Sequence, residues 1–551
     1  MNFFKIDIVK NILNSYKFEK MRKIIQLYFL LFFSFAFSQT ELVFVYFKDK
    51  PNASYFLTNP LSELTQKAID RRTNLGIAIT AQDAPIESSY IQNIQNLGFT
   101  VNDQSKWLNG VAVNATSTQI AQLQAEPYVL KVESFVKNNS AGKISKKEKF
   151  PKNLSSKISF NYGNSLAQIE QVNLRTLHVQ GFTGTGVSIA VIDTGFPTVN
   201  TGSAFARMRS NNQIKHVYNF ISKNTDVYNT SLNNHGTNCL GIIGGYLDGT
   251  FVGAAPDADF YLYATEVGDE EIPEEELYWI QAAEEADRKG VDLISTSLGY
   301  ADFFDDSRYD YSYSQMNGTT SFIARGAQIA SEKGIIVVVA AGNEGNLTWK
   351  YIVTPADNEK VFTIGGVDST GNPSVFTSFG PNSVGKVKPD ASARATSTYF
   401  AYNNGAYPGN GTSYATPLSA GGIACLLQAI PNSTNRELLK NSLRQTASLY
   451  PNYTDQLGYG ILNFGQVLSS FLKTNEFYSQ NKAIVYPNPA KQEINISSTQ
   501  KIEKIYVYNS LGQFLFESKT NQINIEKLEK GLYFLKIKTS SSETVEKFIK
   551  E

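Results

Sequence analysis

Three polar side chains in the middle of the chain have the types and the order that nucleophilic catalysis needs. Asp193 lies in VIDTG, His235 in NHGTN and Ser413 in GTSYATP. A serine hydroxyl is a weak nucleophile until an imidazole takes its proton, and a carboxylate fixes the tautomer of that imidazole and stabilises its cation. The chain holds three histidines, and neither His178 nor His216 has the glycine-rich setting of His235. The sequence therefore indicates an Asp-His-Ser arrangement.

The elements that must position these residues alternate between strands and helices from residue 159 to residue 472. Short apolar segments without polar alternation are typical of strands buried on both faces of a parallel sheet, and they cover residues 187–192, 260–264, 291–296, 335–340 and 361–367. A helical pattern covers residues 274–289, with Gly290 just after it. This alternation predicts a parallel α/β domain.

Asp193 and Ser413 fall where such a domain collects functional groups. Asp193 closes an expected strand, and open α/β sheets bind ligands at the carboxyl ends of their strands. Ser413 lies where a glycine-containing turn enters an expected helix. The N-terminus of a helix offers a positive field and free N–H groups to an anion.

Five segments of this domain resemble the subtilisin-like serine proteases, the subtilase family. They are VIDTG, HGTNCLGIIGG, ISTSLGY, VVAAGNEG and GTSYATPLSAG, and they span almost all of residues 159–472. Asp, then His, then Ser is also the chain order of subtilisin. The resemblance implies that Asp193 orients His235, that His235 is the general base and later the general acid, and that Ser413 is the nucleophile of an acyl-enzyme mechanism.

The same resemblance implies the remaining site residues. Asn343 matches the side-chain donor of the oxyanion hole, and the backbone N–H of Ser413 is the second donor. Two segments match those that line the substrate cleft and pair with an extended peptide: Ser297, Leu298 and Gly299, and Ala340, Ala341 and Gly342. Without the resemblance, both segments read as ordinary strand ends with glycine turns.

The N-terminal region predicts export and processing. Residues 24–37 are apolar and follow Lys20, Arg22 and Lys23, which is typical of a signal peptide covering residues 1–38. Residues 39–142 predict a small α+β unit, which resembles the inhibitory propeptide of subtilases through WLNGVAV and QIAQLQAEPYVLKVE. Residues 143–158 form a basic linker, a natural region for maturation cleavage.

The C-terminal region changes character again. After a linker at residues 473–482, residues 483–551 alternate apolar and polar positions and predict a small all-β sandwich. The motifs YPNP, KGLYFLKI and EKFIKE resemble the C-terminal sorting domain of the type IX secretion system. The alternative is a generic sandwich that binds sugar or protein. The fold class is therefore a subtilisin-like parallel sheet with helices on both faces at residues 159–472, between the α+β propeptide and the sandwich.

Composition limits the remaining function classes. Lys plus Arg is 50 and Asp plus Glu is 50, so no basic surplus favours nucleic acid. The two cysteines, Cys239 and Cys425, exclude a four-thiolate zinc site, and their pairing stays open. No metal and no cofactor is needed for the chemistry, and structural calcium stays open.

The sequence thus predicts a serine endopeptidase made as a preproenzyme and secreted or held at the outer cell surface. Its partners would be polypeptide substrates, its own propeptide as an intramolecular inhibitor, and the secretion machinery through the C-terminal domain. The alternative is an adhesin or peptide-binding protein on a degenerate protease scaffold. An esterase is disfavoured because Ser413 does not lie in a G-x-S-x-G elbow.

Overall fold

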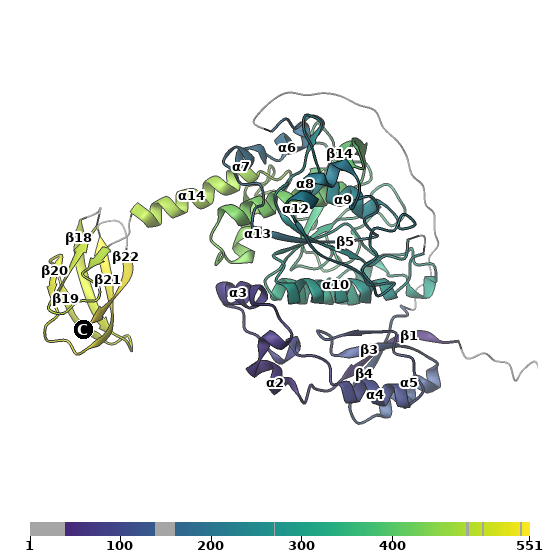
Figure 1. Ribbon diagram of the computed structural model, residues 1–551, viewed down its shortest axis with the longest axis horizontal. Helices are drawn as coiled ribbons and strands as arrows, with labels where there is room; N and C mark the ends of the chain where they lie inside the picture. Colours follow the sequence, from purple (N-terminus) through teal and green to yellow (C-terminus); the bar gives the residue numbers. More distant parts are fainter. Residues whose placement is uncertain (1–38, 138–159, 269, 481–483, 499–500, 540–542) are drawn as a thin grey trace, which may run out of the picture.

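A computed structural model describes residues 39–137, 160–268, 270–480, 484–498, 501–539 and 543–551, and three units follow one another along the chain (Figure 1). The expected signal peptide at residues 1–38 and the expected basic linker at residues 143–158 lie outside the described residues. Among the helices of the described part, none combines the length and the apolar character that crossing a bilayer requires.

The central unit is built on one seven-stranded sheet in the order β13-β12-β11-β10-β5-β9-β6, and every pairing in it is parallel. The expected parallel α/β fold is therefore confirmed. Five of the strands match the five apolar segments of the sequence: β5 (Ser188–Asp193), β9 (Asp259–Ala264), β10 (Leu293–Thr296), β11 (Ile336–Ala340) and β12 (Phe362–Val367). The two edge strands, β6 (Ile214–Asn219) and β13 (Ala391–Arg394), were not expected.

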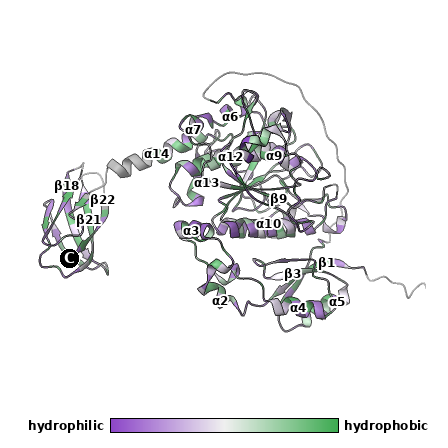
Figure 2. Cartoon of the chain, viewed as in Figure 1, coloured by the Kyte–Doolittle hydropathy of each residue, from purple (hydrophilic) through white to green (hydrophobic). Residues whose placement is uncertain are grey.

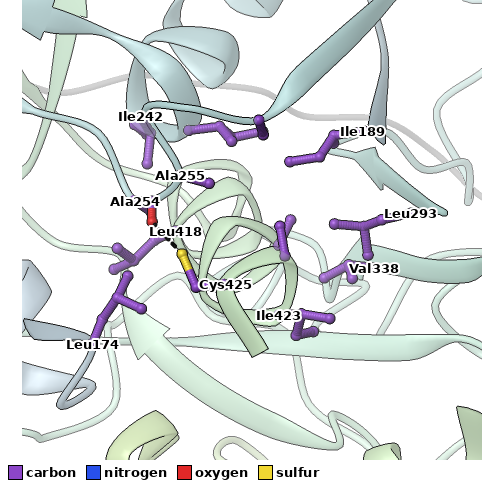
Figure 3. Packing of buried hydrophobic residues seen from close by; sticks show 14 of the residues in the cluster. Leu174, Ile189, Ile242, Ala254, Ala255, Leu293, Val338, Leu418, Ile423 and Cys425 are labelled. Carbon is purple, nitrogen blue, oxygen red and sulfur yellow. Dashed lines mark hydrogen bonds between the residues drawn. The ribbon is translucent and has the colours of Figure 1, made fainter. Parts of the chain in front are cut away.

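Helices cover both faces of this sheet. Helices α9 (His235–Gly244) and α12 (Thr412–Ala429) belong to one hydrophobic core, and α10 (Glu274–Lys289) and α11 (Phe322–Glu332) belong to the other. Figure 3 shows the first core, in which residues from the sheet and its loops surround α12. There the Cys425 thiol donates to the Ala254 carbonyl at 3.3 Å, and both cysteines are buried free thiols.

Close approach between α9 and its neighbours depends on a glycine. A Cβ added at Gly241 would lie 2.0 Å from the carbonyl oxygen of Ala401, so a larger residue would push α9 out of place. Because α9 begins at His235, this contact also fixes where the candidate base lies.

The N-terminal unit is an antiparallel sheet in the order β2-β3-β1-β4, formed by β1 (Glu41–Phe47), β2 (Asp103–Ser105), β3 (Gly110–Ala115) and β4 (Val129–Ser134). One face carries α4 (Ser88–Asn96) and α5 (Ser117–Ala125), whose apolar residues share a core with β1 and β3. The other face lies along α10, which carries both hydrophobic and hydrophilic residues (Figure 2). The expected α+β unit is confirmed.

A segment between β1 and β2 adds two helices to this unit, α2 (Ala53–Thr58) and α3 (Gln66–Leu75). Helix α3 contacts α10 near the C-terminal end of that helix, where Thr65 N–H donates to the Arg288 carbonyl at 3.0 Å. The N-terminal unit therefore contacts α10 at two places, through one face of its sheet and through helix α3.

The C-terminal unit follows α14 (Phe464–Gln480), which continues through most of the segment expected as a linker (Figure 1). Two antiparallel sheets pack around one apolar core, which confirms the small sandwich. One sheet holds β16 (Ile484–Tyr486), β17 (Glu493–Ser497) and β20 (Gln522–Asn524). The other holds β18 (Ile502–Asn509), β19 (Phe514–Ser518), β21 (Gly531–Thr539) and β22 (Glu543–Lys550).

Candidate active site

The candidate site lies at the carboxyl edge of three adjacent strands of the central sheet. Asp193 is the last residue of β5, Ser297 follows the end of β10, and Asn343 lies just beyond the end of β11. Because β5, β10 and β11 are parallel neighbours, their carboxyl ends meet at one edge. This is the edge at which open α/β sheets bind ligands.

Asp193 and His235 form a direct pair across 42 residues of sequence. Nδ1 of His235 lies 2.8 Å from Oδ1 of Asp193, the Asp193 carboxylate is buried, and the imidazole is 27% exposed. The backbone N–H of Thr194 also donates to Oδ1 of Asp193 at 2.8 Å. Burial alone would lower the pKa of His235, but the Asp193 carboxylate outweighs it and raises that pKa well above its usual value.

Ser413 lies in the first turn of α12, next to the helix that carries His235. Gly411 precedes this helix with a φ of +142°, a backbone region that favours glycine. The Sγ atom of Cys239 connects the two helices, since it lies 3.8 Å from Nδ1 of His235 and 3.5 Å from the Ser413 carbonyl oxygen. The ring of Tyr414 lies beside the imidazole, with 6.1 Å between the centroids.

The Ser413 hydroxyl does not hydrogen-bond to His235 in the described part of the chain. It donates instead to the carbonyl of Ser297 at 3.4 Å. Hydrogen bonds between catalytic groups are often long or misaligned when no substrate is bound, and they shorten in the productive complex. The geometry therefore brings the three residues into one site without joining the last two.

The side chain of Asn343 is fixed by hydrogen bonds to its oxygen, which leaves its amide nitrogen free to donate. Oδ1 accepts hydrogen bonds from the backbone N–H of Thr412 at 2.8 Å and from its hydroxyl at 3.1 Å. A Cβ built on Gly411 would lie 3.6 Å from both Nδ2 of Asn343 and the backbone nitrogen of Ser413. Both nitrogens therefore lie close to Gly411, two residues before Ser413, and N–H donors near a nucleophile can stabilise an oxyanion.

A cavity of about 120 Å³ opens beside these groups. It is lined by Ser413, Asn343 and five of the six residues expected at the substrate cleft: Ser297, Leu298, Gly299, Ala340 and Gly342. The sixth, Ala341, is fully buried, and its backbone bonds to Ile364 and Val353 of the interior. Ala341 therefore supports the wall of the cavity without lining it.

Four lining residues were not identified as site residues from the sequence: Phe303, Glu344, Val353 and Thr412. Glu344 directly follows Asn343 in the AAGNEG segment, so its place next to a candidate site residue was the available signal. Phe303 and Val353 come from loops after β10 and β11, and no motif marks them.

The other two histidines have structural settings. His178 is buried, with Nδ1 2.7 Å from the Tyr162 hydroxyl and Nε2 2.9 Å from the Ala254 carbonyl. Burial lowers the pKa of His178 to about 4, so this imidazole is neutral. His216 lies on β6 with Nε2 3.8 Å from a carboxylate oxygen of Glu285.

Among the residues that the structure describes, two clusters bring possible metal ligands within 4.8 Å of one another: Asp193, His235 and Cys239, and Glu266, Glu271 and Glu275. The first coincides with the candidate catalytic pair. In the second, Glu266 accepts from the hydroxyls of Thr265 and Tyr300, and Glu275 accepts from two backbone N–H groups. Burial and mutual repulsion raise the pKa of Glu275 to about 8 and that of Glu271 to about 9.

Comparison with known proteins finds three family models along the chain. The model "Subtilase family" matches residues 184–466, "Peptidase S8 propeptide domain, Bacteroidota" matches residues 42–152, and "Secretion system C-terminal sorting domain" matches residues 484–551. The three matches follow the three units of the fold.

The proteins that are similar to this chain over most of their own length are also serine proteases by name. Subtilisin NAT of Bacillus subtilis subsp. natto is 28% identical over 378 residues, which are 67% of this chain and 83% of that protein. Subtilisin DY of Bacillus licheniformis is 30% identical over 303 residues, which are 54% of this chain and 94% of that protein. The solved structure of the epidermin leader peptide processing serine protease of Staphylococcus aureus shares the fold, with a TM-score of 0.53, 17% identity, and coverage of 78% of this chain and 99% of that one.

Proposed function

The chain belongs to the subtilase family of serine proteases, with a propeptide and a C-terminal sorting domain, and from this premise we propose the residues and steps of its reaction. Asp193, His235 and Ser413 form the catalytic triad, and Asn343 is the oxyanion donor. The observation that carries the proposal is the 2.8 Å contact between His235 and Asp193 beside a serine at a helix N-terminus.

The reaction we propose forms and breaks one acyl-enzyme. After the Ser413 hydroxyl turns from the Ser297 carbonyl toward His235, its oxygen attacks the peptide carbonyl carbon while the imidazole takes the proton. The carbonyl oxygen becomes an oxyanion, which Nδ2 of Asn343 and the backbone N–H of Ser413 stabilise. His235 then gives the proton to the leaving amine, and a water molecule hydrolyses the ester by the same steps. No cofactor takes part.

The N-terminal unit acts as an inhibitor bound to the catalytic domain. Its contacts support this role, since Glu284 of α10 accepts from the Ser105 hydroxyl at 2.6 Å and from the Trp107 backbone N–H at 3.0 Å. The ring of Phe135, just after β4, stacks on Phe322 of α11 with 3.8 Å between the centroids. This surface becomes free when the propeptide is removed after cleavage in the basic linker.

We also propose that the chain is exported in two steps. The C-terminal sorting domain indicates export to the cell surface or the medium. The apolar segment at residues 24–37 acts as the signal peptide for the first membrane, and residues 483–551 are then read by the type IX machinery.

The experiment that tests this function compares hydrolysis of an unstructured protein substrate by the full chain and by Ser413→Ala. We expect the wild type to process its own propeptide and degrade the substrate. The variant should fold, remain unprocessed and be inactive, because loss of the nucleophile from the triad of subtilisin lowers kcat by about 10⁶. A folded, processed wild type without hydrolysis would favour the binding-protein alternative.

A further inference from the structure

The imidazole of His235 is held by polar contacts at one nitrogen only. Among the described residues, its polar partners are Asp193 and Cys239, whose Oδ1 and Sγ atoms lie 2.8 Å and 3.8 Å from Nδ1. The Ser413 hydroxyl does not hold Nε2, because it donates to the Ser297 carbonyl. Contacts at Nδ1 alone let the ring rock about that atom, so a further contact is needed to fix the direction in which Nε2 points.

Two aromatic rings pack in sequence beside this imidazole. The Tyr414 ring stacks against it, with 6.1 Å between the centroids and 29° between the planes. Phe400 of β14 (Thr398–Tyr402) stacks on Tyr414 in turn, with 5.3 Å between the centroids and 20° between the planes. Tyr414 directly follows Ser413 in the chain, so the ring beside the imidazole is joined to the residue toward which Nε2 has to point.

The surroundings of Tyr414 keep its ring in place. The side-chain amide of Asn238, three residues after His235 on α9, donates to the Tyr414 hydroxyl at 3.4 Å. Gly409 ends β15 (Gly405–Gly409), and a Cβ built on it would lie 2.4 Å from Cε2 of Tyr414. Gly409 does not have a positive φ, so the space that the ring takes, and not the backbone conformation, excludes a larger residue there.

Resting on the proposed function, we propose that Tyr414 is a positioning residue that keeps Nε2 of His235 directed at Ser413. The hydrogen bond at Nδ1 and the ring contact together restrict the imidazole more than either does alone. A base has to lie within hydrogen-bond reach of the proton it takes, and a misplacement of about 1 Å can lower a rate about 10²-fold. Tyr414 itself exchanges no proton.

The test replaces the ring in the processed enzyme. Tyr414 is not among the residues that line the substrate cavity. Tyr414→Leu should therefore lower kcat for a peptide substrate about 10- to 100-fold and leave KM within about twofold. Tyr414→Phe keeps the ring and loses only a long hydrogen bond, so its kcat should stay within about fivefold of the wild type. The rate of labelling by a fluorophosphonate should fall with kcat, because that reaction also needs the base.

A second variant moves the ring without removing it. Gly409→Ala places a Cβ against Tyr414 and 3.1 Å from Cε1 of Phe400, and it should lower kcat in the same way. When Gly409→Ala and Tyr414→Leu are combined, the two losses should not add, because both act through one ring. Tyr407→Leu is the matched control. Tyr407 also lies on β15, but it is 49% exposed and its ring lies beside Phe400, so kcat should not change.

The outcomes separate this inference from the proposed function. A wild-type kcat in Tyr414→Leu, or an equal loss in Tyr407→Leu, overturns the positioning role and leaves the triad intact. A loss that appears only in KM also overturns it, as does a Tyr414→Phe variant as slow as Tyr414→Leu. A wild type that neither hydrolyses peptides nor reacts with the fluorophosphonate contradicts the proposed function itself. If Tyr414→Leu does not fold, Gly409→Ala measured against Tyr407→Leu decides.

Discussion

Nδ1 of His235 lies 2.8 Å from Oδ1 of a buried Asp193, while the imidazole itself is partly exposed. A carboxylate bound at Nδ1 leaves Nε2 as the nitrogen that can accept a proton. The hydrogen bond from Thr194 N–H fixes the carboxylate in turn. A buried carboxylate in this position can hold the imidazole in one orientation and stabilise its cation, while the imidazole itself stays accessible.

The first prediction concerns pH. Because the Asp193 carboxylate outweighs burial and raises the pKa of His235 well above its usual value, the imidazole of the free enzyme keeps its proton to a higher pH than a free imidazole does. A protonated imidazole cannot act as base, so kcat/KM should rise with pH as His235 loses its proton, and it should level off at a higher pH than a free imidazole would give.

The raised pKa of His235 has the opposite effect on folding stability, which should fall as pH rises. A raised pKa means that the folded state binds the proton more tightly than the unfolded state, so the pair stabilises the fold below the ordinary His pKa and loses that contribution as pH rises through the folded value. A pH profile of kcat/KM, with thermal unfolding of Ser413→Ala at the same pH values, checks both. Asp193→Asn should move the kinetic limb to lower pH, and a flat profile would contradict His235 as base.

The second prediction separates the two ends of the Asn343 side chain. Asn343→Ala removes both the Nδ2 donor and the Oδ1 acceptor of Thr412. It should lower kcat about 10²- to 10³-fold with little change in KM, which is the loss that removal of the oxyanion-hole asparagine causes in subtilisin. Asn343→Asp keeps an acceptor for Thr412 but places a negative charge where the donor was. If Asn343→Asp retained wild-type kcat, Nδ2 would not be the oxyanion donor.

The third prediction concerns the buried ion pairs between the propeptide and the catalytic domain. Arg71 and Arg72 of α3 both pair with Asp287 of α10, the Arg72 contact measuring 2.5 Å. Arg72 also lies 2.8 Å from Asp83, which in turn lies 2.9 Å from Lys333 at the end of α11. All of these side chains are 6% exposed or less.

Removing one partner from such a network leaves an uncompensated buried charge, which costs about 3–5 kcal/mol. Arg72→Met, in a full chain that carries Ser413→Ala, should therefore lower the free energy of unfolding by about that amount in urea titration. Lys67→Met is the control, because Lys67 lies on the same helix but is 42% exposed and 3.5 Å from Asp292, so its loss should cost about 0–1 kcal/mol. Equal effects would show that the buried network does not hold the propeptide.

Much of the fold could be predicted because its central strands are apolar on both faces. The two edge strands lack that signal: β6 reads IKHVYN, in which Lys215, His216 and Asn219 interrupt the apolar residues, and β13 reads ASAR, which has little β propensity. β6 is mostly half-buried, so its sequence need not be continuously apolar, whereas β13 is buried but consists of small residues and one arginine.

Some residues of the candidate site could also be predicted from the sequence, and others could not. Asp193, His235, Ser413 and Asn343 each lie in a short motif, so sequence could nominate them. Phe303 reaches the cavity from the loop after β10, and no motif in the sequence marks it. The Arg72–Asp287 pair joins residues 215 apart, and each of them alone reads as an ordinary surface charge.

The most direct measurement of the central claim is labelling of the processed protein with a fluorophosphonate, followed by mass spectrometry of its peptides. The probe reacts with a serine only when a neighbouring base activates it. Ser413→Ala, processed by a trace of wild-type enzyme, is the matched control. We predict one adduct, on Ser413, in the wild type and none in the variant. A folded, propeptide-free wild type without an adduct, or with one on another serine, would contradict the account.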